Sequence, residues 1–294
     1  MRAVNAACWL LVGALSLGCA GRQEAGEDSG ASLAGATCGD PEDTQAFVIT
    51  SMAFTREQSA GVLEGFDLDG IESAAGDAQG CGHADYAGPS GETGIDNAFA
   101  ALVDVLESIG AGAVEGLIED AINSGELLIL LELEAVDDPL DDSCVDMSLY
   151  RGMGIPLLDT NGNIQMDQTF AVDPEQRTSF AEGGSITDGT FEITGVQVFL
   201  PVQILDEFLE FDLVGGAIRV SWQEDGTVAG QLAGGVSVAS LAGQIGAISD
   251  IGGLQDVVPP LLEQAADLWP DESGACTHLS IGFDITARPA FVAE

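Results

Sequence analysis

Two short acidic motifs carry the side chains best suited to hold a metal ion. Asp67 and Asp69 stand at alternate positions before Gly70, as ligands do at the start of many calcium-binding loops. A second run offers side-chain oxygens at its first, third, fifth and ninth positions, which are Asp159, Asn161, Asn163 and Asp167. Calcium prefers such carboxylate and amide oxygens, so these six residues are the ligands predicted for a calcium site. No cofactor is expected otherwise, and calcium is the alternative to having none.

Each motif also has a simpler interpretation as a turn. No glutamate follows Asp69 at the spacing that an EF-hand requires. In the second run Ile164 occupies the glycine position of an EF-hand and Phe170 the glutamate position. The Asn161-Gly162 pair is typical of a hairpin turn, whereas the first motif fits a solvated loop.

Of the six cysteines, Cys8 leaves with an N-terminal leader and Cys19 is either lipidated or removed. The other four are predicted to form two disulfides: Cys38, Cys81, Cys144 and Cys276. The sequence leaves three connectivities open. Cys38–Cys81 with Cys144–Cys276 is the pairing that we expect.

A zinc site is the alternative use of two of these cysteines. Cys81 is followed two residues later by His83, and Cys276 by His278, which makes a set of two thiols and two imidazoles. The spacing departs from common zinc modules, and an oxidising compartment favours disulfides.

Signatures of enzymes are missing from the sequence. It holds no Gly-x-Ser-x-Gly, no His-Glu-x-x-His and no phosphate-binding loop, and all seven basic residues are arginines. Pairs of carboxylates serve glycoside hydrolysis, but 49 acidic residues offer no basis for choosing one pair. We therefore predict no catalytic residues, and a carboxylate-based hydrolase is the third functional hypothesis.

The N-terminus predicts export. Arg2 precedes the uncharged, mostly apolar run 3–17, which is too short to span a bilayer and is typical of a signal peptide. The ending Leu-Ser-Leu-Gly-Cys resembles the lipobox of bacterial lipoproteins, and this resemblance implies that Cys19 is lipidated. The alternative is cleavage after Ala20, which releases the chain from the membrane. The predicted organisation is a signal peptide at 1–18, a flexible tether at 19–45 and one domain at 46–294.

The charge balance limits the partners. The formal net charge is −42, and hydrophobic residues make up 46% of the chain, enough for a folded core. Such a chain is repelled by nucleic acid and by anionic lipid. The predicted partners are therefore the membrane, reached through a lipid anchor, and divalent cations or a basic partner. A diffuse acidic surface that only confers solubility, or adaptation to a salty habitat, is the alternative.

The apolar pattern predicts an α+β domain made mainly of antiparallel β-sheet, sandwich- or barrel-like, with two short helical segments. Apolar stripes over 99–109 and 114–122 indicate the helices, and 259–269 fits a further short helix opened by Pro259-Pro260. Strands are expected at 47–54 and 127–133, and at successive hairpins with Asn161-Gly162, Asp188-Gly189 and Asp225-Gly226 at their turns. The last strand, after Cys276, is expected to pair inside the sheet.

Short motifs along the mature chain resemble uncharacterised exported lipoproteins of myxobacteria. The motifs are Gly65-Phe-Asp-Leu-Asp-Gly70, Gly80-Cys-Gly82, Gly94-Ile-Asp-Asn97 and Ala287-Arg-Pro-Ala-Phe291. The resemblance implies an exported protein of the bacterial outer membrane, facing the periplasm or the surface, and implies no activity. We therefore expect a non-catalytic envelope-anchored lipoprotein with a binding or structural role. A calcium-dependent adhesion or ligand-binding module is the second functional hypothesis.

Overall fold

The computed structural model describes Cys38 and the ranges 44–108, 114–204, 207–247 and 254–293. The predicted signal peptide, the tether up to residue 37 and the lipidation site Cys19 lie outside these residues. The described part contains ten strands and four helices, in the following order: β1 (Gln45–Phe54), α1 (Ala100–Ser108), α2 (Val114–Ser124), β2 (Ile129–Glu134), β3 (Asp141–Met153), β4 (Gln168–Val172), β5 (Ser179–Thr187), β6 (Thr190–Ile204), β7 (Glu207–Trp222), β8 (Val228–Ser237), α3 (Val238–Ala247), α4 (Leu254–Ala265), β9 (Leu268–Pro270) and β10 (Cys276–Ala293).

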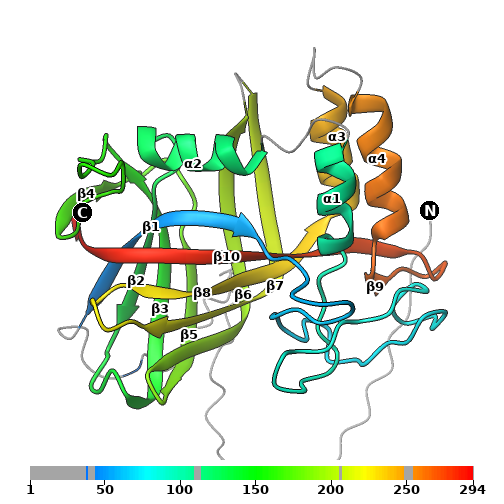
Figure 1. Cartoon of the computed structure of the whole chain (residues 1–294), viewed down its shortest axis with the longest axis horizontal. Helices are drawn as coiled ribbons and strands as arrows, with labels where there is room; N and C mark the ends of the chain where they lie inside the picture. Colours follow the sequence, from blue (N-terminus) through cyan, green and yellow to red (C-terminus); the bar gives the residue numbers. More distant parts are fainter. Residues whose placement is uncertain (1–37, 39–43, 109–113, 205–206, 248–253, 294) are drawn as a thin grey trace, which may run out of the picture. The chain divides into compact units, whose positions relative to one another are not determined.

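Eight strands close into an antiparallel barrel (Figure 1). Their order around the barrel is β1, β10, β8, β7, β6, β5, β3 and β2, and β2 pairs again with β1. Two short strands extend the sheet beside β10, with β4 parallel to it and β9 antiparallel. The predicted fold class is thus confirmed in its barrel-like form. β10 has partners on both sides, as expected.

The barrel interior holds the apolar core. In β10, Leu279, Ile281, Phe283 and Ile285 are all buried, while Asp284 and Thr286, on either side of Ile285, are exposed. Alternate residues of a strand point to opposite faces, so the first set fills the barrel and the second lies on its outer wall. The large side chains of β2 and β3, such as Leu131 and Met147, complete this core.

Turn residues position the hairpins. Asp188 and Gly189 both have positive φ angles, 50° and 71°, as a tight β5–β6 hairpin requires. At Gly195 (φ 75°) the β6–β7 register shifts, which marks a bulge, and apolar side chains stay inward on both sides of it. The Asn161-Gly162 turn is closed by one isolated bridge, Leu158 to Ile164, rather than by two strands.

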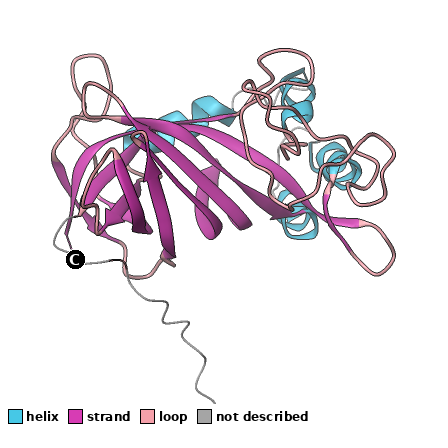
Figure 2. Cartoon of the chain, turned by 90° about the horizontal axis from the view of Figure 1, so that it is seen from below, coloured by secondary structure: helices cyan, strands magenta, loops and turns pink. Residues whose placement is uncertain are grey.

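The helices lie outside the closed sheet (Figure 2). Four helices lie in the described ranges: α1 and α2 are the two predicted helical segments, and α4 overlaps the further predicted helix. The Gly-rich stretch after β8 adds α3, which packs against α4. Pro259-Pro260 lie inside α4 and do not open it. Buried Val258 and Leu262, four residues apart, hold this helix on the core, so tertiary packing overrides the local effect of the prolines. No helix in the described residues is long and apolar enough to cross a membrane.

The segment between β1 and α1 is a long acidic loop, and it covers part of the outer wall. Phe66 packs on Ala217 of β7 and Ala233 of β8. Close by, the ring of Trp269 lies where a side chain on Gly235 would otherwise project. Small outward-facing residues on β7 and β8 thus make room for the loop and for β9.

Candidate functional site

A row of polar side chains crosses the outer wall next to this small-residue patch. The strand register places Asp284 of β10 opposite Gln231 of β8, Gln231 opposite Arg219 of β7, and Arg219 opposite Glu192 of β6. Directly opposed residues on one face of a sheet lie within contact distance. We call these four residues the polar ladder.

The Asp284 carboxylate of the ladder is held in place by two hydrogen-bond donors. Gln231 Nε2 donates to Asp284 Oδ1 at 3.0 Å, and Thr55 Oγ1 donates to the same oxygen at 2.8 Å. Gln231 Nε2 also donates to the carbonyl of Glu64 in the acidic loop at 3.1 Å. Gln231 and Thr55 are buried, whereas Asp284 is exposed. Asp284 is therefore an exposed hydrogen-bond acceptor whose orientation is fixed by two buried side chains.

Arg219 is held just as firmly. Its Nε donates to Glu192 Oε2 at 2.6 Å, and its guanidinium lies 4.6 Å from the centre of the Phe66 ring. It also contacts the carbonyl of Gly65 at 3.5 Å. The loop residues 64–66 thus contact two of the four ladder residues and orient both.

A row of hydroxyls runs parallel to the ladder, two residues further along each strand. Ser51 and Thr286 bond at 2.8 Å, and Thr190 and Ser221 bond at 2.8 Å, with Ala229 between the two pairs. Because residues two apart share a face, both rows lie on the same outer surface.

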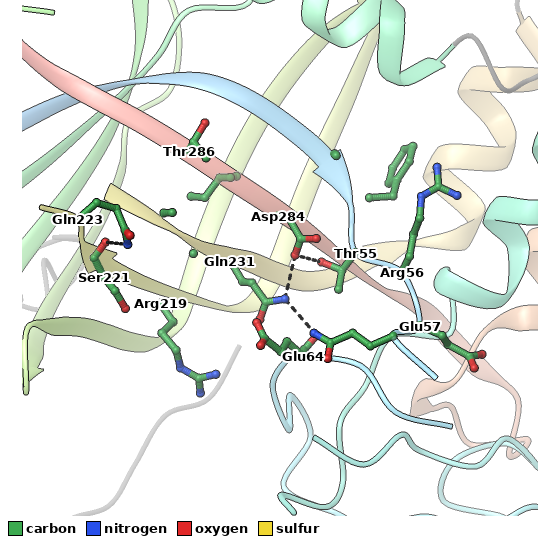
Figure 3. A pocket seen from close by; sticks show the side chains of 16 residues that line it. Thr55, Arg56, Glu57, Glu64, Arg219, Ser221, Gln223, Gln231, Asp284 and Thr286 are labelled. Atoms are coloured by element: carbon green, nitrogen blue, oxygen red, sulfur yellow. Dashed lines mark hydrogen bonds between the residues drawn. The ribbon is translucent and has the colours of Figure 1, made fainter. Parts of the chain in front are cut away.

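Arg219, Gln231 and Asp284 of the ladder, with Ser221 and Thr286 of the hydroxyl row, line an open groove of about 690 Å³. The groove crosses β1, β10, β8 and β7, and loop residues Thr55 to Gln58 form one of its sides. Figure 3 shows Asp284, Gln231, Arg219 and Thr55 facing this space, with Arg56 at its edge. The lining is mainly amide, hydroxyl, carboxylate and guanidinium, which suits a polar ligand.

A second cluster lies in the acidic loop directly after Phe66. Carboxylate oxygens of Asp67, Asp69 and Asp96 lie within 4.8 Å of one another. Backbone amides hold each side chain, from Gly70 to Asp67 at 2.7 Å, from Ile71 to Asp69 at 2.8 Å and from Leu68 to Asp96 at 2.6 Å. The predicted ligands Asp67 and Asp69 are therefore brought together. Asp96, which is not among the predicted ligands, joins them.

Burial changes the ionisation of this cluster. It raises the pKa of Asp96 to about 8, and the charges of Asp69, Asp267 and Asp85 add to the shift. The pKa of Asp69 is also raised, first by burial and then by Asp67. When Asp96 is ionised, its buried negative charge lies close to other carboxylates. A bound divalent cation would offset this repulsion.

The other predicted calcium loop is organised around a turn. Asp159 Oδ1 accepts from the amides of Asn161 at 2.8 Å and Asn163 at 3.0 Å, and Arg288 lies 3.6 Å from its other oxygen. Asp167 bonds through its backbone to Pro289. Asp159 is thus held by the backbone of its own turn and by Arg288, an arrangement that fits the turn interpretation.

The cysteines form two disulfides, but not in the expected pairing. Cys38 is bonded to Cys144 and Cys81 to Cys276. The expected pairing was wrong because it joined cysteines without regard to the barrel, which places the acidic loop beside the start of β10. The Cys81–Cys276 bond also uses both thiols of the alternative zinc set. His83 instead contacts the carbonyl of Gln264 at 3.0 Å.

One more buried carboxylate lies near the loop. Burial raises the pKa of Asp267 to about 6, even though Ser280 bonds to it through both its amide and its hydroxyl. Ser280 Oγ in turn accepts from the amide of Ala98 at 2.7 Å, next to the start of α1. Asp267 therefore joins α1 to β10 and has a structural role.

A comparison with known proteins finds no matching family model, curated protein or solved structure. The function of the groove is therefore inferred from the chemistry of its lining residues. The carboxylates with the most strongly raised pKa values, Asp96 and Asp267, do not line it. A fixed acceptor and a fixed donor on an open surface are suited to binding a ligand rather than to acid–base catalysis.

Proposed function

We propose that this chain is an exported, non-catalytic binding protein, held at the bacterial outer envelope by a lipid on Cys19, and that the groove is its ligand site. The polar ladder is the observation that carries this proposal. Asp284 and Arg219 are oriented before any ligand arrives, because Gln231, Thr55, Glu192 and Phe66 already hold them. Such preorganisation lowers the entropy cost of binding.

Two further observations support the proposed location. The leader resembles a lipobox, and both disulfides are typical of proteins that fold outside the cytosol. Mass spectrometry of the protein purified from its native membrane tests the anchor. We expect an acylated Cys19, and membrane release of a Cys19→Ala variant. An unmodified mature chain beginning at Gly21 would contradict the anchor and leave the groove unaffected.

Binding in the groove is tested by thermal shift with three polar probes of different charge. The probes are cellohexaose as a neutral oligosaccharide, inorganic polyphosphate as a polyanion and octalysine as a polycation. We expect at least one probe to raise the melting temperature of the wild type and to lose this effect in the double variant Asp284→Asn, Arg219→Met.

Glu119→Gln is the matched control, since Glu119 is an exposed carboxylate of α2 outside the groove. It should respond to the probes as the wild type does. If no probe shifts the wild type, or if every shift survives in the double variant, the groove is not a ligand site.

Calcium-dependent ligand binding is the second candidate function, and the clustering of Asp67, Asp69 and Asp96 favours it. The same loop carries residues 64–66, which contact the ladder, so a cation here would stiffen one side of the groove. A ligand at 100 times its dissociation constant stabilises a protein by about 2.7 kcal/mol. We expect millimolar calcium to raise the melting temperature of the wild type but not of Asp67→Asn, Asp69→Asn. Equal curves with calcium and with chelator would remove this candidate.

The hydrolase hypothesis gains no such support. Catalysis by carboxylates requires a close pair with one member shielded from water. Among the described residues that line the groove, Asp284 is exposed, as are Glu57 and Glu64.

A further inference from the structure

We infer that the groove binds a neutral oligosaccharide, recognised by hydrogen bonds from Asp284, Arg219 and the neighbouring hydroxyls. The inference rests on the proposed function, because it names the ligand class of the same site. It follows from three features of the groove, which are its charge balance, its mixture of donors and acceptors, and its length.

The charge balance disfavours an anionic ligand. Arg219 is paired with Glu192 at 2.6 Å, and Arg56 with Glu115 at 2.9 Å, so both guanidiniums of the groove are already neutralised. An anion would also approach a chain of net charge −42. A cation is favoured by that overall charge and by the lining carboxylates Asp284, Glu57 and Glu64. An ammonium group only donates hydrogen bonds, however, so a polycation would leave the Arg219 donor unmatched.

The hydrogen-bonding groups suit a polyhydroxylated ligand. Asp284 uses Oδ1 for both of its bonds to the protein, which leaves Oδ2 as an acceptor. Arg219 uses Nε and one terminal nitrogen, which leaves the other terminal nitrogen as a donor. Ser221 and Thr286 contribute hydroxyls that both donate and accept. Asp284 and Arg219 lie two strands apart, so different hydroxyls of one sugar chain can donate to Asp284 and accept from Arg219. A ligand with acceptors alone would leave Asp284 unmatched.

The length of the groove favours a chain of sugars over a single one. Neighbouring strands lie roughly 4.8 Å apart, so the four strands that the groove crosses extend over roughly 14 Å. Polar groups occur on β10, β8 and β7 along this path. A linear ligand lying across the strands would contact all three in turn.

Isothermal titration calorimetry with cellohexaose, maltohexaose and chitohexaose tests the inference, with glucose as the length control. We expect at least one hexasaccharide to bind the wild type at least tenfold more tightly than glucose. Asp284→Asn should weaken that binding at least tenfold. Its amide oxygen can still accept from Thr55 and Gln231, while the groove-facing acceptor becomes a donor.

Arg219→Lys provides a second variant that keeps the charge but loses the planar donor, and it should weaken binding by a similar factor. Glu119→Gln should bind as the wild type does. The melting temperature of each variant, measured without ligand, shows whether it is folded. Tight binding of polyphosphate or octalysine that depends on Asp284 and Arg219, with no binding of any hexasaccharide, would overturn the inference but preserve the proposed function. No groove-dependent binding of any probe would overturn both.

Discussion

Cys81 is bonded to Cys276, which lies 195 residues further along the chain. The bond fastens the acidic loop to the start of β10, the strand that also carries Asp284. Between Cys81 and β1, the same loop supplies the residues that contact Gln231 and Arg219. One covalent link therefore helps to hold the loop side of the groove against its strand side.

Removing this disulfide should loosen the loop. We expect Cys81→Ser, Cys276→Ser to lower the free energy of unfolding by about 2 to 5 kcal/mol, because a long closed loop is opened in the unfolded chain. Urea denaturation measures the loss. Hydrogen exchange should become faster in residues 64–97. The matched variant Cys38→Ser, Cys144→Ser should lose stability without this local effect. Non-reduced peptides joining Cys38 to Cys81 would contradict the assignment.

Gly235 should not tolerate even a methyl group. A Cβ there would lie 2.6 Å from the Trp269 ring, so Gly235→Ala should destabilise the fold by about 1 to 3 kcal/mol. Gly243→Ala is the control. Gly243 lies inside α3 with nothing within 4 Å of the added carbon, and alanine there should stabilise by about 0.5 to 1 kcal/mol. Equal effects from both substitutions would show that the packing against Trp269 is unimportant.

Asp267 should make stability depend on acidity. Its pKa is raised to about 6, so the folded chain holds this proton more tightly than the unfolded chain, whose carboxyl titrates near 4. The stabilisation that the protonated Asp267 carboxyl provides is complete below pH 4 and is lost as the pH rises through 6. Compared with the wild type, Asp267→Asn should therefore gain about 2 kcal/mol between pH 4 and 7. Urea titrations across this range measure the difference, and parallel curves would refute it.

Protons and calcium should compete at the acidic cluster. Since the pKa of Asp96 is about 8, this carboxyl is mostly protonated at pH 7 in the absence of a cation. Calcium must displace the proton, so its affinity should increase by up to about tenfold per pH unit between pH 6 and 8. Calorimetry in buffers of different ionisation heat would detect the released proton. In Asp96→Asn the pH dependence should flatten, and an unchanged slope would exclude Asp96 as a ligand.

Local patterns in the sequence account for much of the fold. Alternation in β10 and the Asp188-Gly189 turn follow from backbone geometry over a few residues, so both are readable without a structure. The apolar stripes also predict α1 and α2, whereas packing decides where α4 begins.

The candidate site depends on contacts between distant residues. Gln231 and Asp284, which share a hydrogen bond, are 53 residues apart in the sequence. Asp96 accepts a hydrogen bond from the backbone amide of Leu68, 28 residues away. The sequence shows that Arg219, Ser221 and Asp284 alternate with apolar residues, which indicates that they lie on the outer face of the sheet. It does not show which strands are neighbours or how they are aligned. The polar ladder therefore emerges only when the barrel closes.

The seven basic residues of this chain, all arginines, allow a direct test of the groove. In a protein labelled with ¹⁵N-arginine, the Nε resonances are few, and the signal missing from Arg219→Met identifies Arg219. Titration with the tightest-binding hexasaccharide should shift the Arg219 signal. The signals of Arg177 and Arg288, which pair with Asp212 and Asp159 away from the groove, should stay in place. An Arg219 signal that does not move at saturation would contradict the account.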